Sequence, residues 1–279
     1  MMMLKILVMF LVVALQCGAA APQKVISYNI RYDSSGDKGD RDWSVRRSKV
    51  IKFVQDEKPS ILGLQEVLES QLKFIEKNLP GYGRVGVGRY DGKTKGEYSP
   101  VFYDKSVWKV DEKQHGTFWL SDTPKVAGSR SWGNGITRIC TWVRLIDNDG
   151  KGIYVYNTHW DHRSQNSREK SAVLILKTIK NRQHKSEPYI LMGDFNATTD
   201  NVAIKNLLKE GLLVDLCEEQ MKTFNFWKAD LVKGLRIDHI FVAPSLNKVE
   251  VRVAAAGDPP ASDHHPVVMT IDFIMREKP

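Results

Sequence analysis

The sequence predicts an α+β protein in which two packed β-sheets are flanked by helices. Short runs rich in β-branched and aromatic residues recur along the chain and have the length of strands. A few longer stretches have helical spacing, and many strands with few helices are typical of such a sandwich. The chain of 279 residues, 42% hydrophobic and 27% charged, is long enough for a sizeable core and has an ordinary globular composition.

The strand-like runs are spread over residues 24–273, and most of them end in polar residues. They are Lys24–Ile30, Ile61–Val67, Arg84–Val87, Ser99–Tyr103, Gly116–Ser121, Thr137–Ile146, Gly152–His159, Tyr189–Phe195, Arg236–Val242, Val249–Ala255 and Pro266–Phe273. No internal repeat, low-complexity tract or linker interrupts this region of the sequence. We therefore predict one folded domain.

Helical periodicity appears in stretches that separate these strands. Ser44–Asp56 places its apolar residues roughly on one side of a helix. Glu69–Leu79 carries an apolar stripe and is stopped by Pro80. Arg168–Lys180 has a mixed pattern, and Val202–Leu208 is a shorter candidate.

The first residues differ from the rest of the chain and are typical of a secretory signal peptide. One positive charge, Lys5, precedes the apolar run Ile6–Leu15, and small residues follow at positions 18–21. The apolar run is well short of the ~20 residues that span a bilayer. A cleaved signal is therefore favoured over a membrane anchor.

Cleavage after Ala20 is favoured, because Pro22 would be awkward just after the cut. The chain then divides into a signal peptide at residues 1–20 and a domain at residues 21–279. A lipid attached at Cys17 is disfavoured by the large residue before it. We expect a secreted or periplasmic protein without stable membrane insertion.

Two cysteines, Cys140 and Cys217, remain in the predicted domain. In an exported protein they could form a disulfide. Free cysteine is also among the most buried residue types, so two unpaired thiols explain them equally well. The sequence leaves both interpretations open.

The formal net charge of +8 favours anionic partners such as nucleic acid, phosphate esters or membrane surfaces. The positive charges are spread along the sequence without a dense basic block. The charge therefore does not choose among these partners.

Polar residues that carry chemistry follow several of the predicted strands. They are Asn29, Glu66, His159, Asp194, Asn196, Asp238, Asp263 and His264. Each has an ordinary explanation when taken alone, such as a solvent-facing carboxylate, an Asx-rich turn or a core histidine. Burying carboxylates is costly unless they are paired or bind a cation. Strand ends that converge at one rim of a sandwich would place these groups around a single cleft.

The set as a whole resembles the endonuclease/exonuclease/phosphatase superfamily. Its signature elements occur here in the same order, as Asn29, Leu64-Gln65-Glu66, Thr158-His159, Gly193-Asp194-Phe195-Asn196, Ile237-Asp238-His239 and Ser262-Asp263-His264-His265-Pro266. The resemblance spans Val25 to Ile271. Residues 28–33, 96–100 and 116–121 are similar to a secreted and largely uncharacterised branch of the superfamily.

The resemblance implies a four-layered α/β/β/α sandwich of two mixed sheets, the DNase I-like fold. It also implies a divalent cation, Mg²⁺ or Mn²⁺, bound by Glu66 with Asn29 and Asp263 nearby. Hard cations of this kind prefer oxygen ligands and keep several waters, which suits carboxylates and an amide.

The resemblance further implies catalytic roles. His264 would accept a proton from the attacking water, and Asp238 would hold its ring. Asp194 would orient the water, and Asn196 would donate to a non-bridging phosphate oxygen. His159 would stabilise the developing charge from across the phosphate. No covalent intermediate is expected.

Neighbouring residues are candidates for substrate binding. Arg31 and Arg138 could reach phosphate oxygens, although ordinary salt bridges explain them as well. Asp161 and His162 could line the pocket or belong to a surface loop. Trp160 is the tryptophan best placed by sequence to stack on a base or sugar.

We therefore predict a secreted, metal-dependent phosphoesterase whose substrate is either nucleic acid or a small phosphorylated molecule. A sphingomyelinase-like lipid phosphodiesterase is an alternative, but no convincing exposed apolar hairpin supports it. A non-catalytic binding module is disfavoured because every expected chemical position is occupied. The protein is expected to be a monomer.

Overall fold

The computed structural model describes residues 22–218, 220–229 and 233–272. The predicted signal peptide lies outside these residues, as does Phe273 at the end of the last predicted strand. No helix in these ranges combines the length and the apolarity needed to cross a bilayer.

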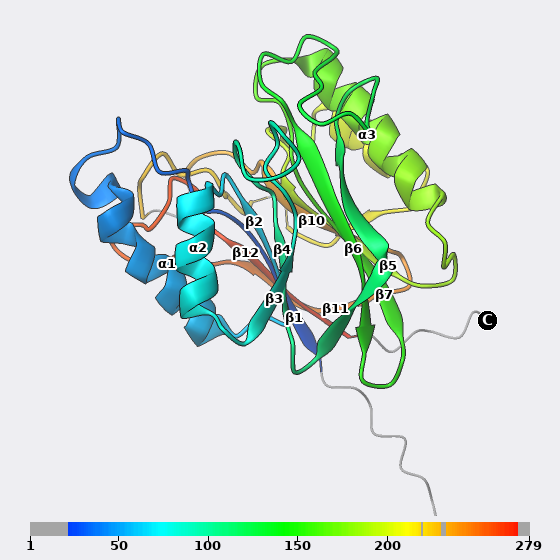
Figure 1. Cartoon of the computed structure of the whole chain (residues 1–279), viewed down its shortest axis with the longest axis horizontal. Helices are drawn as coiled ribbons and strands as arrows, with labels where there is room; N and C mark the ends of the chain where they lie inside the picture. The colour runs from blue at the N-terminus through cyan, green and yellow to red at the C-terminus, as the bar shows by residue number, and fades with distance from the viewer. Residues whose placement is uncertain (1–21, 219, 230–232, 273–279) are drawn as a thin grey trace, which may run out of the picture.

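The described chain forms four layers (Figure 1). Helices α1 (Trp43–Glu57) and α2 (Glu69–Asn78) make one outer layer, and α3 (Gln165–Lys180) lies on the opposite outer face beside the short α4 (Val202–Leu208). Two six-stranded sheets fill the space between these layers. The predicted sandwich of two mixed sheets flanked by helices is confirmed.

The first sheet has the strand order β11-β12-β1-β2-β4-β3. Its strands are β11 (Asn247–Val253), β12 (Val267–Asp272), β1 (Gln23–Asn29), β2 (Ile61–Gln65), β4 (Val101–Asp104) and β3 (Tyr82–Val85). β1 and β2 are parallel, whereas β12 and β4 run antiparallel to them. A parallel pair needs a crossover connection, and α1 supplies it on the outer face.

The second sheet has the strand order β5-β6-β7-β8-β10-β9. Its strands are β5 (Trp108–Trp119), β6 (Ile139–Asp147), β7 (Gly152–His159), β8 (Tyr189–Asp194), β10 (Asp238–Val242) and β9 (Val214–Asp215). Here β7 and β8 form the parallel pair, and α3 is the crossover between them. Each sheet thus has a central parallel pair of strands with an antiparallel strand on either side.

The two parallel pairs bring the carboxyl ends of four strands to one rim of the sandwich. β1 packs against β8, and β2 packs against β7, across the interface between the sheets. β10 and β12 run the other way, so their starts reach the same rim. Asp238 pairs in register with Asp194, and Val267 pairs with Ser27. The segments that carry the polar motifs therefore meet there.

Three buried apolar clusters hold the layers together. One lies between the first sheet and its helices, one between the two sheets, and one between the second sheet and α3 with α4. Each cluster contains fully buried side chains. Examples are Leu64 beside the helices of the first sheet, Met192 between the sheets and Ile175 on α3. Burial of one such side chain contributes roughly 1.5–3 kcal/mol. The rim is therefore built on a rigid scaffold.

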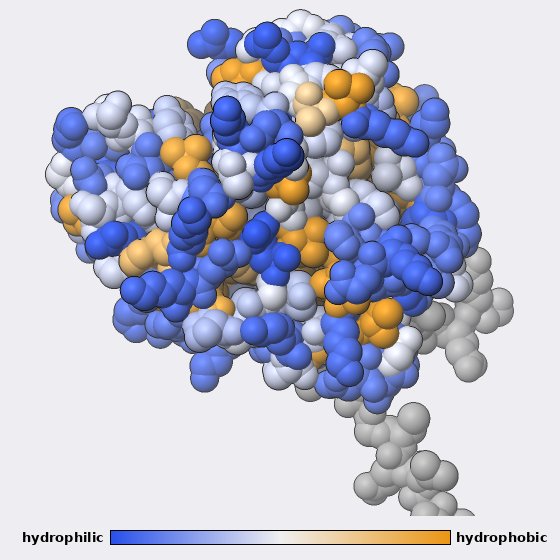
Figure 2. All heavy atoms as spheres, in the orientation of Figure 1, coloured by the Kyte–Doolittle hydropathy of each residue, from blue (hydrophilic) through white to orange (hydrophobic). Residues whose placement is uncertain are grey.

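Large apolar side chains that remain exposed are scattered over different elements. Val45 on α1, Val173 on α3 and Val249 on β11 are examples. The face seen in Figure 2 is mostly hydrophilic, and its hydrophobic residues appear as small separate groups. Isolated apolar residues of this kind are normal on a protein surface. The apolar residues of the described chain are thus concentrated between the layers.

The helices begin and end within a few residues of their predicted bounds, but two strands differ from expectation. β5 begins at Trp108, well before the predicted start at Gly116, because its first half is largely solvent-exposed and polar. β9 was not predicted, since it has only two residues, too few to show a pattern. Cys140 and Cys217 are both free thiols, so the disulfide interpretation is not realised in this structure.

Candidate active site

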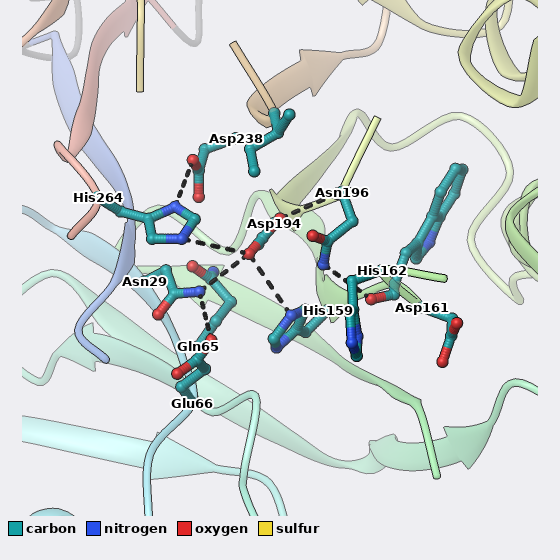
Figure 3. Close-up of polar contacts among 12 residues, drawn as sticks. Asn29, Gln65, Glu66, His159, Asp161, His162, Asp194, Asn196, Asp238 and His264 are labelled. Atoms are coloured by element: carbon teal, nitrogen blue, oxygen red, sulfur yellow. Dashed lines mark hydrogen bonds and ion pairs between the residues drawn. The ribbon is translucent and has the colours of Figure 1, made fainter. Parts of the chain in front are cut away.

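Asp194, the last residue of β8, is the centre of the polar contacts at the rim (Figure 3). Its Oδ2 accepts a hydrogen bond from Asn29 Nδ2 at 2.9 Å and lies 3.5 Å from His159 Nε2 and 3.8 Å from His264 Nε2. Its Oδ1 accepts a hydrogen bond from the backbone N–H of Asn196 at 2.9 Å. The side chain is buried, and burial raises the pKa of Asp194 to about 7.

Gly193 allows β8 to carry Asp194 against β7. It has a φ of 148°, and a Cβ at this position would overlap the backbone oxygen of Thr158. A side chain therefore cannot be accommodated here. The glycine of the Gly-Asp-Phe-Asn motif permits the close approach that puts Asp194 opposite its register partner, His159.

His264 and Asp238 form a second buried pair. His264 Nδ1 lies 2.8 Å from Asp238 Oδ2, which leaves Nε2 turned toward Asp194 (Figure 3). Burial alone would lower the pKa of His264, but the charge and the hydrogen bond of Asp238 outweigh it and raise this pKa to about 10. The ring of Phe224 packs on the imidazole with a centroid distance of 4.8 Å.

Asn29 connects the carboxylates of Glu66 and Asp194. Its Nδ2 donates to Glu66 Oε1 at 3.1 Å as well as to Asp194, and its Oδ1 accepts from the backbone N–H of Arg31 at 3.0 Å. Glu66 Oε2 accepts from the backbone N–H of Tyr32 at 3.1 Å. The fully buried amide thus sets the spacing of two acidic groups that face the cleft.

Three residues of the site have a left-handed backbone. The φ angles of Arg31, Glu66 and Asn196 are 57°, 62° and 48°. Positive φ is uncommon for residues other than glycine, and such strain clusters at functional sites. Each of these residues comes just after a strand, where the turn aims its side chain at the cleft.

The strained turn after β1 is held by the buried guanidinium of Arg46 on α1. It donates to the backbone oxygens of Ile30, Arg31 and Tyr32, and also to that of Ala261 at 3.2 Å. These contacts join the turn after β1 to the segment that leads into β12. A guanidinium suits this role because its donors fan out in one plane.

Gln65, which precedes Glu66, links the two sheets beneath the site. Its Nε2 donates to Asn157 Oδ1 on β7 at 2.7 Å and to Ser27 Oγ at 3.2 Å. Asn157 Nδ2 in turn donates to the backbone oxygens of Leu64 and Pro100 at 2.8 Å. These hydrogen bonds join β2 of the first sheet to β7 of the second sheet directly beneath the rim.

The acidic groups at the rim form a donor set that fits a hard divalent cation. Two groups of side chains have ligand atoms that all lie within 4.8 Å of one another: Glu66, His159 and Asp194, and Asp194, Asp238 and His264. Asp263 lines the same cleft, and burial together with the charge of Glu66 raises its pKa. A bound cation offsets the repulsion between neighbouring carboxylates and so favours their ionised forms. Mg²⁺ and Mn²⁺ prefer oxygen ligands of this kind.

These groups open into a cleft of about 580 Å³. Arg31, Arg138, His162 and Asn196 line it. Arg31 is held by Asp37, with Nε 3.0 Å from Asp37 Oδ2. Arg138 Nη2 lies 3.0 Å from His162 Nδ1, while its Nε and Nη1 are buried without a hydrogen-bond partner among the described residues. The structure therefore brings these residues together with the acidic centre.

Asp161 and Trp160 do not face the cleft, which corrects two expectations. The Asp161 carboxylate accepts from the backbone N–H groups of Arg163 and Ser164 at 2.9 and 2.7 Å, and it is 1% exposed. It therefore shapes the loop before α3. Trp160 is fully buried against Phe195, with ring centroids 4.7 Å apart, so its ring is not available for stacking on a ligand.

Other residues of the cleft were not foreseen from the sequence. Arg89, Tyr90, Glu97 and Phe224 line it. The sequence showed Glu97 only within a stretch that resembles the secreted branch, with no role attached. The other three lie in loops, where no periodic pattern indicates which side chains face inward.

The chain is similar to known proteins over most of its length. A family model described as the Endonuclease/Exonuclease/phosphatase family matches residues 26–264. The crystal structure of an endonuclease/exonuclease/phosphatase from Bacteroides vulgatus is 32% identical, covers 90% of this chain and 99% of its own, and has a TM-score of 0.83. The mannosyl-6-phosphatase of Bacteroides thetaiotaomicron is 33% identical, covers 90% of this chain and 100% of its own, and has a TM-score of 0.83.

A probable RNA exonuclease of Saccharomyces cerevisiae is 24% identical over 212 residues, which are 68% of this chain and 41% of the exonuclease. The family match includes the acidic and histidine centre from Asn29 to His264. The chain belongs to the Endonuclease/Exonuclease/phosphatase family, whose members are phosphoesterase hydrolases.

Proposed function

We propose that this protein is an exported, monomeric, metal-dependent phosphoesterase that hydrolyses a small phosphorylated molecule by attack of water on phosphorus. One observation carries the reaction type. His264 and Asp194 line the cleft, the buried Asp238 lies behind His264 at its Nδ1, and Nε2 of the histidine is turned toward Asp194. Such an arrangement can take a proton from a water molecule and orient it at the same time.

His264 is the general base in this proposal. Asp238 accepts a hydrogen bond from Nδ1–H, which keeps the proton on Nδ1 and leaves the free electron pair of a neutral ring on Nε2. Asp194 orients the water beside that nitrogen. A Mg²⁺ or Mn²⁺ ion held by Glu66, with Asp263 and Asp194 beside it, would supply positive charge to the phosphate. The ion would also offset the negative charge of the carboxylates that raise the pKa of His264, so that the ring could be neutral.

The opposite wall binds the phosphate. His159 is buried, and burial together with the charges of Arg138 and Arg89 lowers its pKa, so its imidazole is neutral. A neutral imidazole can donate one hydrogen bond to a phosphate oxygen without adding a proton to it. Arg138 and Asn196 supply further donors. Water is the nucleophile, so no covalent intermediate forms.

A small substrate is favoured over nucleic acid by the shape of the site. The cleft has the volume of a small-molecule pocket, and loops bound it on several sides. The likeness to a mannosyl-6-phosphatase over nearly all of both chains supports the same choice. Nucleic acid is the second candidate because of the net charge of +8 and the likeness to a probable RNA exonuclease.

A substrate panel tests the proposal. The purified protein is assayed with Mg²⁺ on p-nitrophenyl phosphate, hexose phosphates, nucleotides, RNA, plasmid DNA and sphingomyelin, with His264→Ala as the inactive control. We expect release of phosphate from small monoesters and little cleavage of the polymers. Cleavage of RNA or DNA without activity on the monoesters would replace this proposal with the nuclease.

A further inference from the structure

One wall of the cleft is a tightly closed loop, residues 88–97, which we call the lip. Backbone hydrogen bonds close it, from Arg89 N to Glu97 O at 3.2 Å and from Tyr90 N to Lys95 O at 2.9 Å. The Asp91 carboxylate accepts from the backbone N–H groups of Lys93 and Lys95 at 2.9 and 3.0 Å. The lip therefore presents its side chains to the cleft in a defined position.

The lip carries a carboxylate, Glu97, into the cleft beside the wall that would bind the phosphate. Glu97 lines the cleft and is held by both ends of the Arg89 guanidinium, at 2.8 Å from Nη1 and 2.7 Å from Nη2. Its Oε2 lies 3.9 Å from His159 Nδ1, so it adjoins the phosphate-binding wall. The side chain of Glu97 keeps 15% of its surface exposed.

The surroundings of Glu97 decide what it can bind. A carboxylate repels phosphate oxygens, so it is not a second phosphate site. A metal ion would have to compete with a bidentate guanidinium for the same two oxygens. An ionised carboxylate has about four lone-pair sites, and Arg89 occupies two of them. The remaining lone-pair sites of Glu97 can accept hydrogen bonds from neutral donors. In a small phosphate ester, the neutral donors that could lie there are hydroxyl groups.

Tyr90 supplies an apolar surface next to this carboxylate. It lines the cleft with 51% of its surface exposed, and Arg89 lies on its ring at 5.3 Å from the centroid. A Cβ on Gly96 would come within 2.8 Å of the Tyr90 ring, so the glycine leaves room for it. A sugar ring presents C–H groups on its face and hydroxyls at its edge, and an aromatic ring with a nearby carboxylate matches both.

We propose that the lip is a sugar-binding subsite, in which Tyr90 packs on the face of the leaving group and Glu97 accepts hydrogen bonds from its hydroxyls. This inference rests on the proposed phosphatase function and names its substrate class, a sugar phosphate. Arg89 positions Glu97 and balances its charge. The subsite lies beyond His159, as seen from Asp194, where a leaving group would extend from the phosphate.

The test compares a substrate that has a sugar with one that does not. The ratio of kcat/KM for a hexose 6-phosphate to kcat/KM for p-nitrophenyl phosphate is measured for the wild type, Glu97→Gln and Tyr90→Ala. Glu97→Gln keeps the shape of the side chain but removes its charge. Glu112→Gln makes the same change on a side chain that is 87% exposed on β5, away from the cleft.

We expect the ratio to fall about tenfold to hundredfold in Glu97→Gln, since hydrogen bonds to charged groups contribute at that level. The ratio should also fall in Tyr90→Ala and stay unchanged in Glu112→Gln. Free hexose should inhibit hydrolysis of p-nitrophenyl phosphate by the wild type and should inhibit the Glu97→Gln variant more weakly.

The outcomes separate this inference from the function on which it rests. If neither monoester is hydrolysed, the phosphatase proposal fails and the sugar subsite fails with it. If p-nitrophenyl phosphate is hydrolysed but the ratio is the same in the wild type and Glu97→Gln, only the sugar subsite is wrong. Equal losses on both substrates also exclude the sugar subsite, because Glu97 would then act only by positioning His159.

Discussion

Asp194 and Asp238 are register partners on β8 and β10, and each faces a different nitrogen of His264. Asp238 lies 2.8 Å from Nδ1, whereas Asp194 lies 3.8 Å from Nε2. The antiparallel pairing of the two strands fixes both carboxylates on one side of the sheet end. The histidine reaches them from a separate segment just before β12. Roles for the three residues can therefore be separated by substitution.

Replacement of Asp238 by asparagine should reduce kcat by about 10²–10⁴-fold with little change in KM, because the amide cannot hold the proton on Nδ1 as the carboxylate does. His264→Ala should lose at least ~10²-fold. The double variant should be no slower than His264→Ala, since the two residues act as one unit. Steady-state kinetics with circular dichroism as a folding control test this. Near-normal turnover in His264→Ala would remove it from the mechanism.

Removal of divalent cations should abolish activity, and Mg²⁺ or Mn²⁺ should restore it. Binding can be followed without activity, because a ligand at 100 times its Kd stabilises the folded state by about 2.7 kcal/mol. Thermal unfolding of the chelated protein should therefore shift upward on addition of Mg²⁺. Glu66→Gln should lose most of this shift, whereas Glu112→Gln should retain it. Full activity in EDTA would refute the metal requirement.

His239 should make the protein less stable in mild acid. It is fully buried, its Nε2 lies 2.9 Å from the backbone oxygen of Ala197, and burial together with the charge of Arg236 lowers its pKa to about 4. The folded pKa is below the unfolded value of 6.5. The stability that neutral His239 contributes is therefore complete above pH 6.5 and is lost as the pH falls through 4.

Urea unfolding of the wild type and His239→Asn between pH 4 and 8 measures this contribution. Relative to its own value at pH 7, the free energy of unfolding at pH 4 should fall further in the wild type than in the variant, by up to ~3 kcal/mol. The charge of Asp215, whose Oδ2 lies 4.0 Å from His239 Nδ1, favours the protonated ring and is already part of the His239 pKa of about 4. Parallel pH profiles would contradict the prediction.

Gly193→Ala should destabilise the fold by at least ~2 kcal/mol and displace Asp194, because its Cβ would meet the backbone oxygen of Thr158. Gly81→Ala is the matched control, since a Cβ there has no described atom within 4 Å. Chemical denaturation of both variants gives the comparison. If the Gly193→Ala and Gly81→Ala variants had the same free energy of unfolding, β7 and β8 could move apart without loss of stability, and the prediction would be wrong.

Secreted material should begin between Ala19 and Pro22. The small residues at positions 18–21 follow an apolar run of signal-peptide length. N-terminal sequencing of protein recovered from the medium or the periplasm tests this. A secreted chain that still begins at Met1 would be inconsistent with cleavage.

Much of the site could be predicted from local sequence. Asn29, Glu66 and Asp194 lie at strand ends and His264 lies shortly before β12, in a fixed order along the chain. Short runs of β-branched and aromatic residues that stop at polar residues predict where those strands end. Asp161 and Trp160 could not be placed in this way. Both follow β7, in the loop that leads to α3. The path of this loop turns Asp161 toward backbone N–H groups and Trp160 into the core.

The sequence by itself determined the class of fold, the polar groups at the strand ends and the resemblance to phosphoesterases, because these depend on residue type and spacing along the chain. Only the tertiary structure decided which side chains share the cleft. Glu97 faces His159, and Arg46 ties the turn after β1 to the segment before His264, through contacts between residues far apart in the chain. Such contacts leave no periodic trace, since they arise from how two sheets and their loops pack in space.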